Sequence, residues 1–425
     1  MFEPFLFFVF TWKNNYIGFP LSVSRVLHLI VLLLLLSRLI LKLVSKKKLI
    51  FVNNFFPENK YLLLFLILSF LSLFIGIIYG SFNLPQRSNT QYLSGFSVFS
   101  SRVIFEHIIL IFNIFYFAIL PKHLINTKVD FDYLFRIFKI FLIFSLFIGY
   151  ADYLLSKFGI FDLVGRHIRD GIHVGQRFHG LAGEPRQAGA QLFFFMSMYI
   201  LSCIYFKIKI NKWVIFLLGL ASLLTLSTTI FVAFIFLLIF LIIFRIIEFK
   251  LLLILIVILF FMSSVDRIQE YYNLYAIPFL NLLKGEDLQS VNLNILSRDL
   301  FPLSYLWEKF QNYEFLPILL GNGLGSASAV NNLNLDGYFG TANPNIQLVR
   351  LLFEHGLLSA IIFIVSMIWP IKYYTRNTDK KTINLYLFSM LLVLSVTLAV
   401  RSPISFIYLG VLTSFLNFNE KQIKH

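Results

Sequence analysis

The feature that most constrains the fold of this chain is a succession of long apolar runs separated by short polar links. A helix needs roughly 20 apolar residues to cross the hydrocarbon core of a bilayer. Eleven runs reach or approach that length, at residues 26–43, 61–80, 103–120, 134–154, 188–206, 213–226, 229–246, 251–264, 346–369, 383–400 and 403–418. The pattern predicts an all-α polytopic membrane protein.

The composition supports this class. The 425 residues are 58% hydrophobic and only 13% charged, whereas a soluble domain is about half apolar and about a quarter charged. Residues 1–12 are apolar but too short to span alone, and they lack the basic start and small-residue cleavage site of a signal peptide. They fit either a twelfth span or an interfacial segment. We therefore expect residues 1–425 to form a single transmembrane domain, a bundle of about 11–12 helices.

The net charge of +15 comes largely from basic residues in the short links. No basic patch with interleaved aromatic residues appears, so we expect no nucleic-acid partner. Threading the runs as alternating spans places these links on one side, which the positive-inside rule makes cytoplasmic: Lys46–Lys48, Lys122, Lys207–Lys212, Arg245–Lys250 and Lys372–Lys381. Two long polar segments, residues 156–187 and 265–345, then share the opposite face, where we expect the function to lie.

The first polar segment ends in a motif that enters the run at residue 188. Pro185 suits the first turn of a helix, and Glu184 lies where the positive end of the helix favours an acid. Arg177 and Arg186 flank this entrance. They could contact lipid phosphate beside a capped helix, but we favour an anion clamp, because paired guanidinium donors match the oxygens of a diphosphate.

The second polar segment contains three features. Ser297–Arg298 precede an aromatic stretch, either as a capped interfacial helix or as a further cation for an anion. Gly321-Asn-Gly-Leu-Gly325 follows no strand, so we interpret it as a glycine hinge that packs the loop close to the bundle rather than as a phosphate loop. Asn343-Pro-Asn345 leads directly into the next run.

Among the ionisable residues that lie within an apolar run, Glu354 is the main candidate for a functional role. It lies about two helical turns after Asn345, and because a charge in lipid is costly it should face the bundle or a cavity. It is either functional or paired with Arg350 at i−4. Glu106 and His107, at the start of the third run listed above, present the same alternatives.

The sequence offers little for a metal or a disulfide. Cys203 is the only cysteine and lies within an apolar run, which predicts a small buried side chain in a helix. His167, His173 and His179 lack helical metal-ligand spacing, so we expect no metal site. His355 is interpreted as a packed polar residue.

At these residues the chain resembles the O-antigen polymerase and O-antigen ligase superfamily of bacterial membrane glycosyltransferases. The resemblance is carried by Arg177-x-x-Gly180 followed by Glu184-Pro185, by Ser297–Arg298, by Leu320-Gly-Asn-Gly-Leu-Gly325, and by Asn345 through Glu354-His-Gly356-Leu.

The resemblance implies a metal-independent, inverting transfer of a glycan from an undecaprenyl diphosphate carrier, without a cofactor, at the periplasmic face of the inner membrane. Arg177, Arg186, Arg298 and Asn345 would hold the diphosphate, and Glu184 or Glu354 would be the general base. The partners would be lipid-linked glycans and membrane lipids, with a chain-length regulator as an optional further partner.

The chain departs from the family pattern at three places. The missing ligase histidine favours a polymerase over a ligase, and the other two departures change the residues that could contact phosphate. Pro344–Asn345 stand where ligases carry His–Asn, Ser227–Thr228 replace a Ser–Arg pair, and Arg186 replaces an Asn. A ligase remains one alternative. A flippase or transporter for lipid-linked sugars is another, although such proteins tend to contain internal repeats, and no convincing repeat is found.

Overall fold

The computed structural model describes residues 59–80, 98–125, 127–158, 177–180, 185–227, 305–329, 347–398 and 402–424, together with the single residues 33, 230, 233, 234, 237, 277, 302, 303 and 400. These residues form helices and connecting turns, with no strand among them. The prediction of an all-α fold is therefore confirmed for the described part of the chain.

Five described helices are long and apolar enough to cross a membrane: Lys60–Ile78, Val103–Lys122, Lys128–Ser156, Gln187–Tyr205 and Gln347–Tyr374. They coincide with five of the predicted runs, which identifies an all-α membrane protein. The predicted run at residues 251–264 lies outside the described residues. The predicted run at residues 26–43 also lies outside them, except for Leu33. The run at residues 229–246 is described at four positions only.

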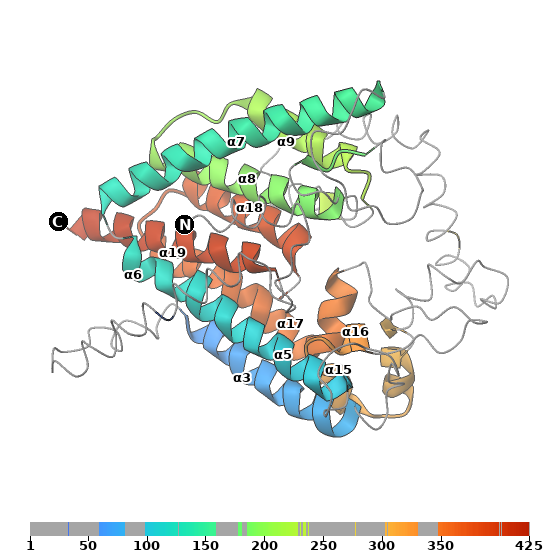
Figure 1. Ribbon diagram of the computed structural model, residues 1–425. Coiled ribbons are helices and arrows are strands. Elements are labelled where there is room, and N and C mark those ends of the chain that lie inside the picture. The colour runs from blue at the N-terminus through green and yellow to red at the C-terminus, as the bar shows by residue number, and fades with distance from the viewer. Residues whose placement is uncertain are drawn as a thin grey trace.

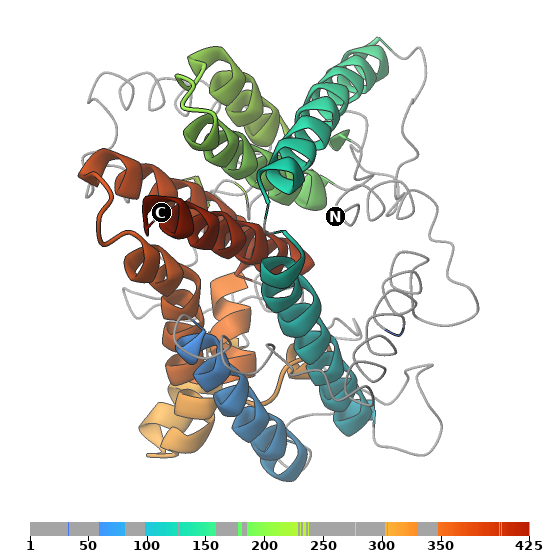
Figure 2. The same cartoon turned by 90° about the vertical axis from the view of Figure 1, so that its left-hand side faces the viewer.

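The described helices form two groups joined by a central pair (Figures 1 and 2). One group contains α7 (Lys128–Lys157), α8 (Pro185–Tyr205) and α9 (Lys212–Leu224). The other contains α3 (Lys60–Ile75), α5 (Val98–Phe112), α15 (Phe315–Leu320), α16 (Ser326–Ala329) and α17 (Gln347–Tyr374). Between them, α18 (Lys380–Thr397) packs against α8 and α17, and α19 (Pro403–Lys424) packs against η2 (Asn113–Ile119) and α6 (Leu120–Leu124).

Side-chain caps fix where two of these helices begin. Thr127 and Asp130 form a capping box at α7, in which the Asp130 carboxylate accepts from the Thr127 N–H at 2.9 Å. Asp379 caps α18 by accepting from the Thr382 N–H at 2.9 Å. Hydrogen bonds from the Thr382 hydroxyl and backbone lower the pKa of Asp379. This cap therefore contributes stability above the ordinary aspartate pKa and loses it as the pH falls through the lowered value.

Aromatic side chains fill the interior where α7, α8 and α19 meet. The rings of Phe131 and Phe415 lie 5.8 Å apart, and those of Phe135 and Tyr205 lie 5.2 Å apart. Cys203 on α8 is buried, as expected of a small side chain in a packed helix. The Phe-rich composition thus fills the bundle interior as well as covering lipid-facing surfaces.

Candidate functional site

An ion pair is buried near the start of α17. The Arg350 Nε donates to the Glu354 Oε1 at 3.2 Å, one helical turn along the same helix. Arg350 is 8% exposed and Glu354 only 2%. The pairing at i−4, one of the two alternatives for Glu354, is confirmed. Pairing does not exclude a function, because ionisable residues inside a membrane protein commonly mark functional sites.

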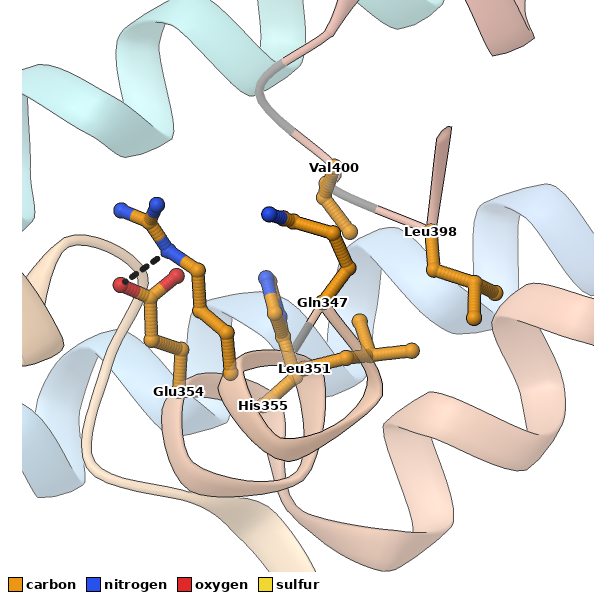
Figure 3. Close-up of a pocket in the computed structure, with 7 residues that line it drawn as sticks. Gln347, Leu351, Glu354, His355, Leu398 and Val400 are labelled. Carbon is orange, nitrogen blue, oxygen red and sulfur yellow. Dashed lines mark hydrogen bonds and ion pairs between the residues drawn. The ribbon is translucent and has the colours of Figure 1, made fainter. Parts of the chain in front are cut away.

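This ion pair borders a small pocket (Figure 3). Gln347, Leu351, Glu354 and His355 come from α17, and Leu398 and Val400 come from the turn after α18. The pocket volume is about 10 Å³, room for roughly one water molecule. A carboxylate, a guanidinium, an amide and an imidazole therefore meet at one small pocket, a set that can accept, donate and relay protons.

Two buried histidines, His355 on α17 and His107 on α5, lie between this pocket and α3. The His355 Nδ1 lies 3.3 Å from the Ser69 Oγ, and the ring packs 5.5 Å from the ring of Phe65. The His107 ring lies 6.4 Å from that of His355. Its Nδ1 is 2.7 Å from the Val103 carbonyl oxygen, and its Nε2 is 2.8 Å from the Ser69 carbonyl oxygen. Because a neutral imidazole has one N–H, only the doubly protonated ring could donate to both carbonyls.

The glycine turn after α15 holds α17 in place. Gly321 and Gly356 both adopt positive φ angles, of 79° and 72°, and Gly356 interrupts the helical geometry of α17. Just before this interruption, the glycine turn hydrogen-bonds to the α17 backbone at Phe353 and Glu354. The backbone and side-chain N–H groups of Asn322 donate to the Phe353 oxygen at 3.0 and 3.1 Å.

A serine on α3 completes this junction. The Ser72 hydroxyl donates to the Glu354 carbonyl oxygen at 2.8 Å and accepts from the Gly323 N–H at 3.0 Å. Backbone freed by a break in a membrane helix must find such partners, because lipid offers none. The predicted packing of the glycine segment against the bundle is confirmed, and the segment fixes the backbone at Glu354.

Arg177, a predicted diphosphate ligand, contacts the end of α9. Its Nε donates to the Thr225 carbonyl at 2.9 Å, and its Nη2 donates to the Leu226 carbonyl at 3.0 Å. A cation at the carboxyl end of a helix satisfies carbonyls that the helix leaves unpaired. This guanidinium therefore has a structural role. Its part in binding a diphosphate stays a prediction.

We expect Arg177→Gln to lower the free energy of unfolding by about 2 kcal/mol. The glutamine amide nitrogen takes the position of the arginine Nε, so the substitution removes the Nη2 bond to Leu226, and one hydrogen bond to a charged group contributes about 1.5–3 kcal/mol. Thermal unfolding of the detergent-solubilised protein measures the change. Arg136→Gln, at an exposed arginine on α7, is the matched control and should have little effect. Equal melting temperatures for the two variants would show that the contacts at Thr225 and Leu226 add no stability.

The remaining predicted site residues are described less fully. Arg298, Asn345 and Glu184 lie outside the described residues. Arg186 lies in the first turn of α8, which begins at Pro185 as expected, but its side chain is not described. The two described candidates are held by different helix groups, Arg177 at the end of α9 and Glu354 beside α3.

Several residues of the site were not predicted from the sequence. Gln347 lines the pocket, Asn322 holds the Phe353 carbonyl, and Ser69 and Ser72 line the face of α3 toward α17. The two serines carried a signal that could have been used. They lie three residues apart in an otherwise apolar run, so they share one helix face.

Comparison of the chain with protein-family models, with curated proteins and with solved structures gave no match.

Proposed function

We propose that this protein is a polymerase that joins undecaprenyl-diphosphate-linked oligosaccharide repeat units into a surface polysaccharide at the periplasmic face of the bacterial inner membrane. In this proposal the bundle has about 11–12 spans, and the segments 156–187 and 265–345 face the periplasm. The observation that supports it most is the buried carboxylate of Glu354, held by Arg350 beside a small pocket, nine residues after Asn345 in the sequence.

The reaction requires a base and a place for negative charge. The acceptor hydroxyl attacks the anomeric carbon of the donor sugar, the bond from that carbon to the diphosphate oxygen breaks, and the hydroxyl proton passes to a carboxylate. Glu354 is suited to that role, with Glu184 as the other candidate. Arg177, Arg186 and Arg298, with Asn345, would bind the departing diphosphate and stabilise its charge.

We expect Glu354→Gln to remove the long rungs of the surface-polysaccharide ladder on a gel while the protein remains in the membrane at normal level. Loss of a general base typically slows a reaction by about 10²–10⁴-fold. Glu308→Gln is the matched control, because Glu308 is exposed on another described helix, and it should leave the ladder unchanged. A wild-type ladder from Glu354→Gln at normal protein level would refute the role of Glu354.

A second candidate function is a flippase or transporter of lipid-linked sugars. One observation favours it: α17 is interrupted at Gly356 inside a span, next to buried ionisable groups, and transporters often combine these two features. The two functions differ in where single lipid-linked units collect in the Glu354→Gln strain. Units outside the membrane indicate a blocked polymerase, and units inside indicate a blocked flippase. Finished polymer left on its lipid carrier would instead indicate a ligase.

A further inference from the structure

The described part of the segment 265–345 contains a large exposed apolar surface. We call residues 305–320 the aromatic hairpin. Its exposed apolar members are Trp307 at 61%, Phe310 at 52%, Tyr313 at 81%, Phe315 at 46%, Leu316 at 54% and Leu319 at 38%, and Glu308, Gln311 and Asn312 are exposed as well. Contiguous apolar exposure of this kind marks an interaction site, whereas single exposed apolar residues need no explanation.

The aromatic members form a continuous surface. The rings of Trp307 and Phe310 are stacked 5.7 Å apart. Phe315 lies 6.1 Å from Phe310 and 6.3 Å from Tyr313. On the other side of the hairpin, Tyr305 turns inward and donates to the Asn322 side chain at 3.1 Å. The hairpin is thus held on one side by protein and uncovered on the other.

The deep end of the hairpin lies beside the membrane spans. A Cβ added to Gly356 would lie 2.4 Å from the Leu319 backbone, and Gly323 bonds to Ser72. Gly356 is nine residues into the span Gln347–Tyr374, roughly 14 Å along a helix axis at 1.5 Å per residue. Ser72 lies within the span Lys60–Ile78. The hairpin therefore descends alongside these spans, as Figure 1 shows for α15 near the end of α3.

The exposed surface continues onto the outward faces of the spans. α15 packs against α3 and α17. Phe74 on α3 is 58% exposed, and Leu357 and Ile361 on α17 are 43% and 49% exposed. In a membrane-spanning helix such residues face lipid. Leu316 and Leu319 of the hairpin are exposed on α15, the helix that packs against these two spans.

An aromatic and cationic cluster marks the opposite membrane boundary. The Lys60 Nζ lies 4.4 Å above the Trp369 ring, and the Tyr61 ring lies 4.9 Å from that ring. Trp, Tyr and Lys gather at membrane–water interfaces. The 19-residue span from Lys60 to Ile78 is about 28 Å long, close to the roughly 30 Å hydrocarbon thickness. The second interface then falls at the hairpin end of α3.

We propose that the aromatic hairpin is a re-entrant membrane segment whose exposed face contacts lipid. Its aromatic rings lie at the interface, and Leu316 and Leu319 contact acyl chains. The irregular backbone of Gly321–Gly323 is tolerated at this depth because it is buried and bonded to α3 and α17. The packing and exposure of the aromatic hairpin favour this position whichever reaction the protein performs.

Site-directed fluorescence in nanodiscs tests the proposal. In a Cys203→Ala background, single cysteines Leu316→Cys, Ile361→Cys and Asn377→Cys are labelled with the fluorophore NBD. Ile361 is the lipid-facing reference on α17, and Asn377 is the aqueous reference in the exposed turn before α18. We expect lipids brominated on their acyl chains to quench NBD at 316 about as strongly as at 361. Aqueous iodide should quench only the label at 377.

Two results would overturn the proposal. Quenching at 316 by iodide but not by brominated lipid would place the hairpin in water. Quenching by neither would mean that a second copy or another protein covers it. Leu319→Cys repeats the measurement at a second exposed position of the hairpin, so a poor yield of one variant does not decide the result.

Discussion

Gly356→Ala is expected to be one of the most destabilising single substitutions in the described part of the chain. The backbone there has φ 72° and ψ 174°, a region that costs a residue with a side chain about 1–3 kcal/mol. The new methyl would also lie 2.4 Å from the Leu319 carbonyl group and 2.5 Å from the Gly321 nitrogen. Overpacking adds about 1–3 kcal/mol, so the expected loss is about 2–6 kcal/mol of a total near 5–15 kcal/mol.

The measurement is the yield and melting temperature of the variant in detergent. Gly219→Ala is the matched control, because a Cβ at that position in α9 meets nothing within 4 Å. Alanine inside a helix is favoured over glycine by about 0.5–1 kcal/mol, so this control should be neutral or slightly stabilising. Equal behaviour of the two variants would mean that the close approach of Gly356 to α15 does not exist in the folded protein.

The Gly356→Ala substitution is also expected to disturb the candidate site. The break at this residue turns the carbonyls of Phe353 and Glu354 toward Asn322 and Ser72. Those contacts fix the backbone that carries the Glu354 carboxylate. The same glycine therefore sets both the docking of the aromatic hairpin and the position of the candidate base.

Much of the fold could be predicted from the sequence because a membrane span is a local property of composition. The predicted run at residues 103–120 matches the helix Val103–Lys122. Ends were less predictable. α7 begins at Lys128, six residues before the predicted start at residue 134, because the capping box of Thr127 and Asp130 carries the helix into a polar stretch that hydropathy alone leaves out.

In the candidate site, too, contacts between residues close in sequence could be predicted, and contacts between distant residues could not. The pairing of Arg350 with Glu354 was predictable, since helical spacing places residues four apart on one face. The contact of Gly323 with Ser72 was not, because 251 residues separate them. Arg177 likewise finds its carbonyl partner Thr225 48 residues away. Guanidinium chemistry alone suits a diphosphate and a helix end equally, so the sequence could not choose between them.

Breaking the buried ion pair between Arg350 and Glu354 is also expected to cause a large loss of stability. Arg350→Met should lower the free energy of unfolding by about 3–5 kcal/mol, because it leaves the carboxylate of Glu354 buried without its cation. The double variant Arg350→Met with Glu354→Leu should lose much less than the sum of its single substitutions, since no charge is then left unpaired. Unfolding of the four proteins of this cycle in a denaturing detergent measures the coupling between the two residues.

A second ion pair supplies the control for this cycle. The Lys309 Nζ and the Glu314 Oε2 lie 2.9 Å apart, with the Lys309 side chain 11% exposed and the Glu314 side chain 39% exposed. Because the carboxylate left by Lys309→Met is accessible to water, this substitution should cost less than about 1 kcal/mol. Comparing the two pairs shows whether burial or distance determines the loss of stability. The Lys309–Glu314 pair is the shorter of the two, yet its loss is expected to destabilise the protein less. Additive losses at Arg350 and Glu354, or losses no larger than at Lys309, would mean that water reaches the pocket and solvates the pair. Glu354 would then be an ordinary accessible carboxylate, and its candidacy as the base would have to rest on the chemistry of its neighbours rather than on its burial.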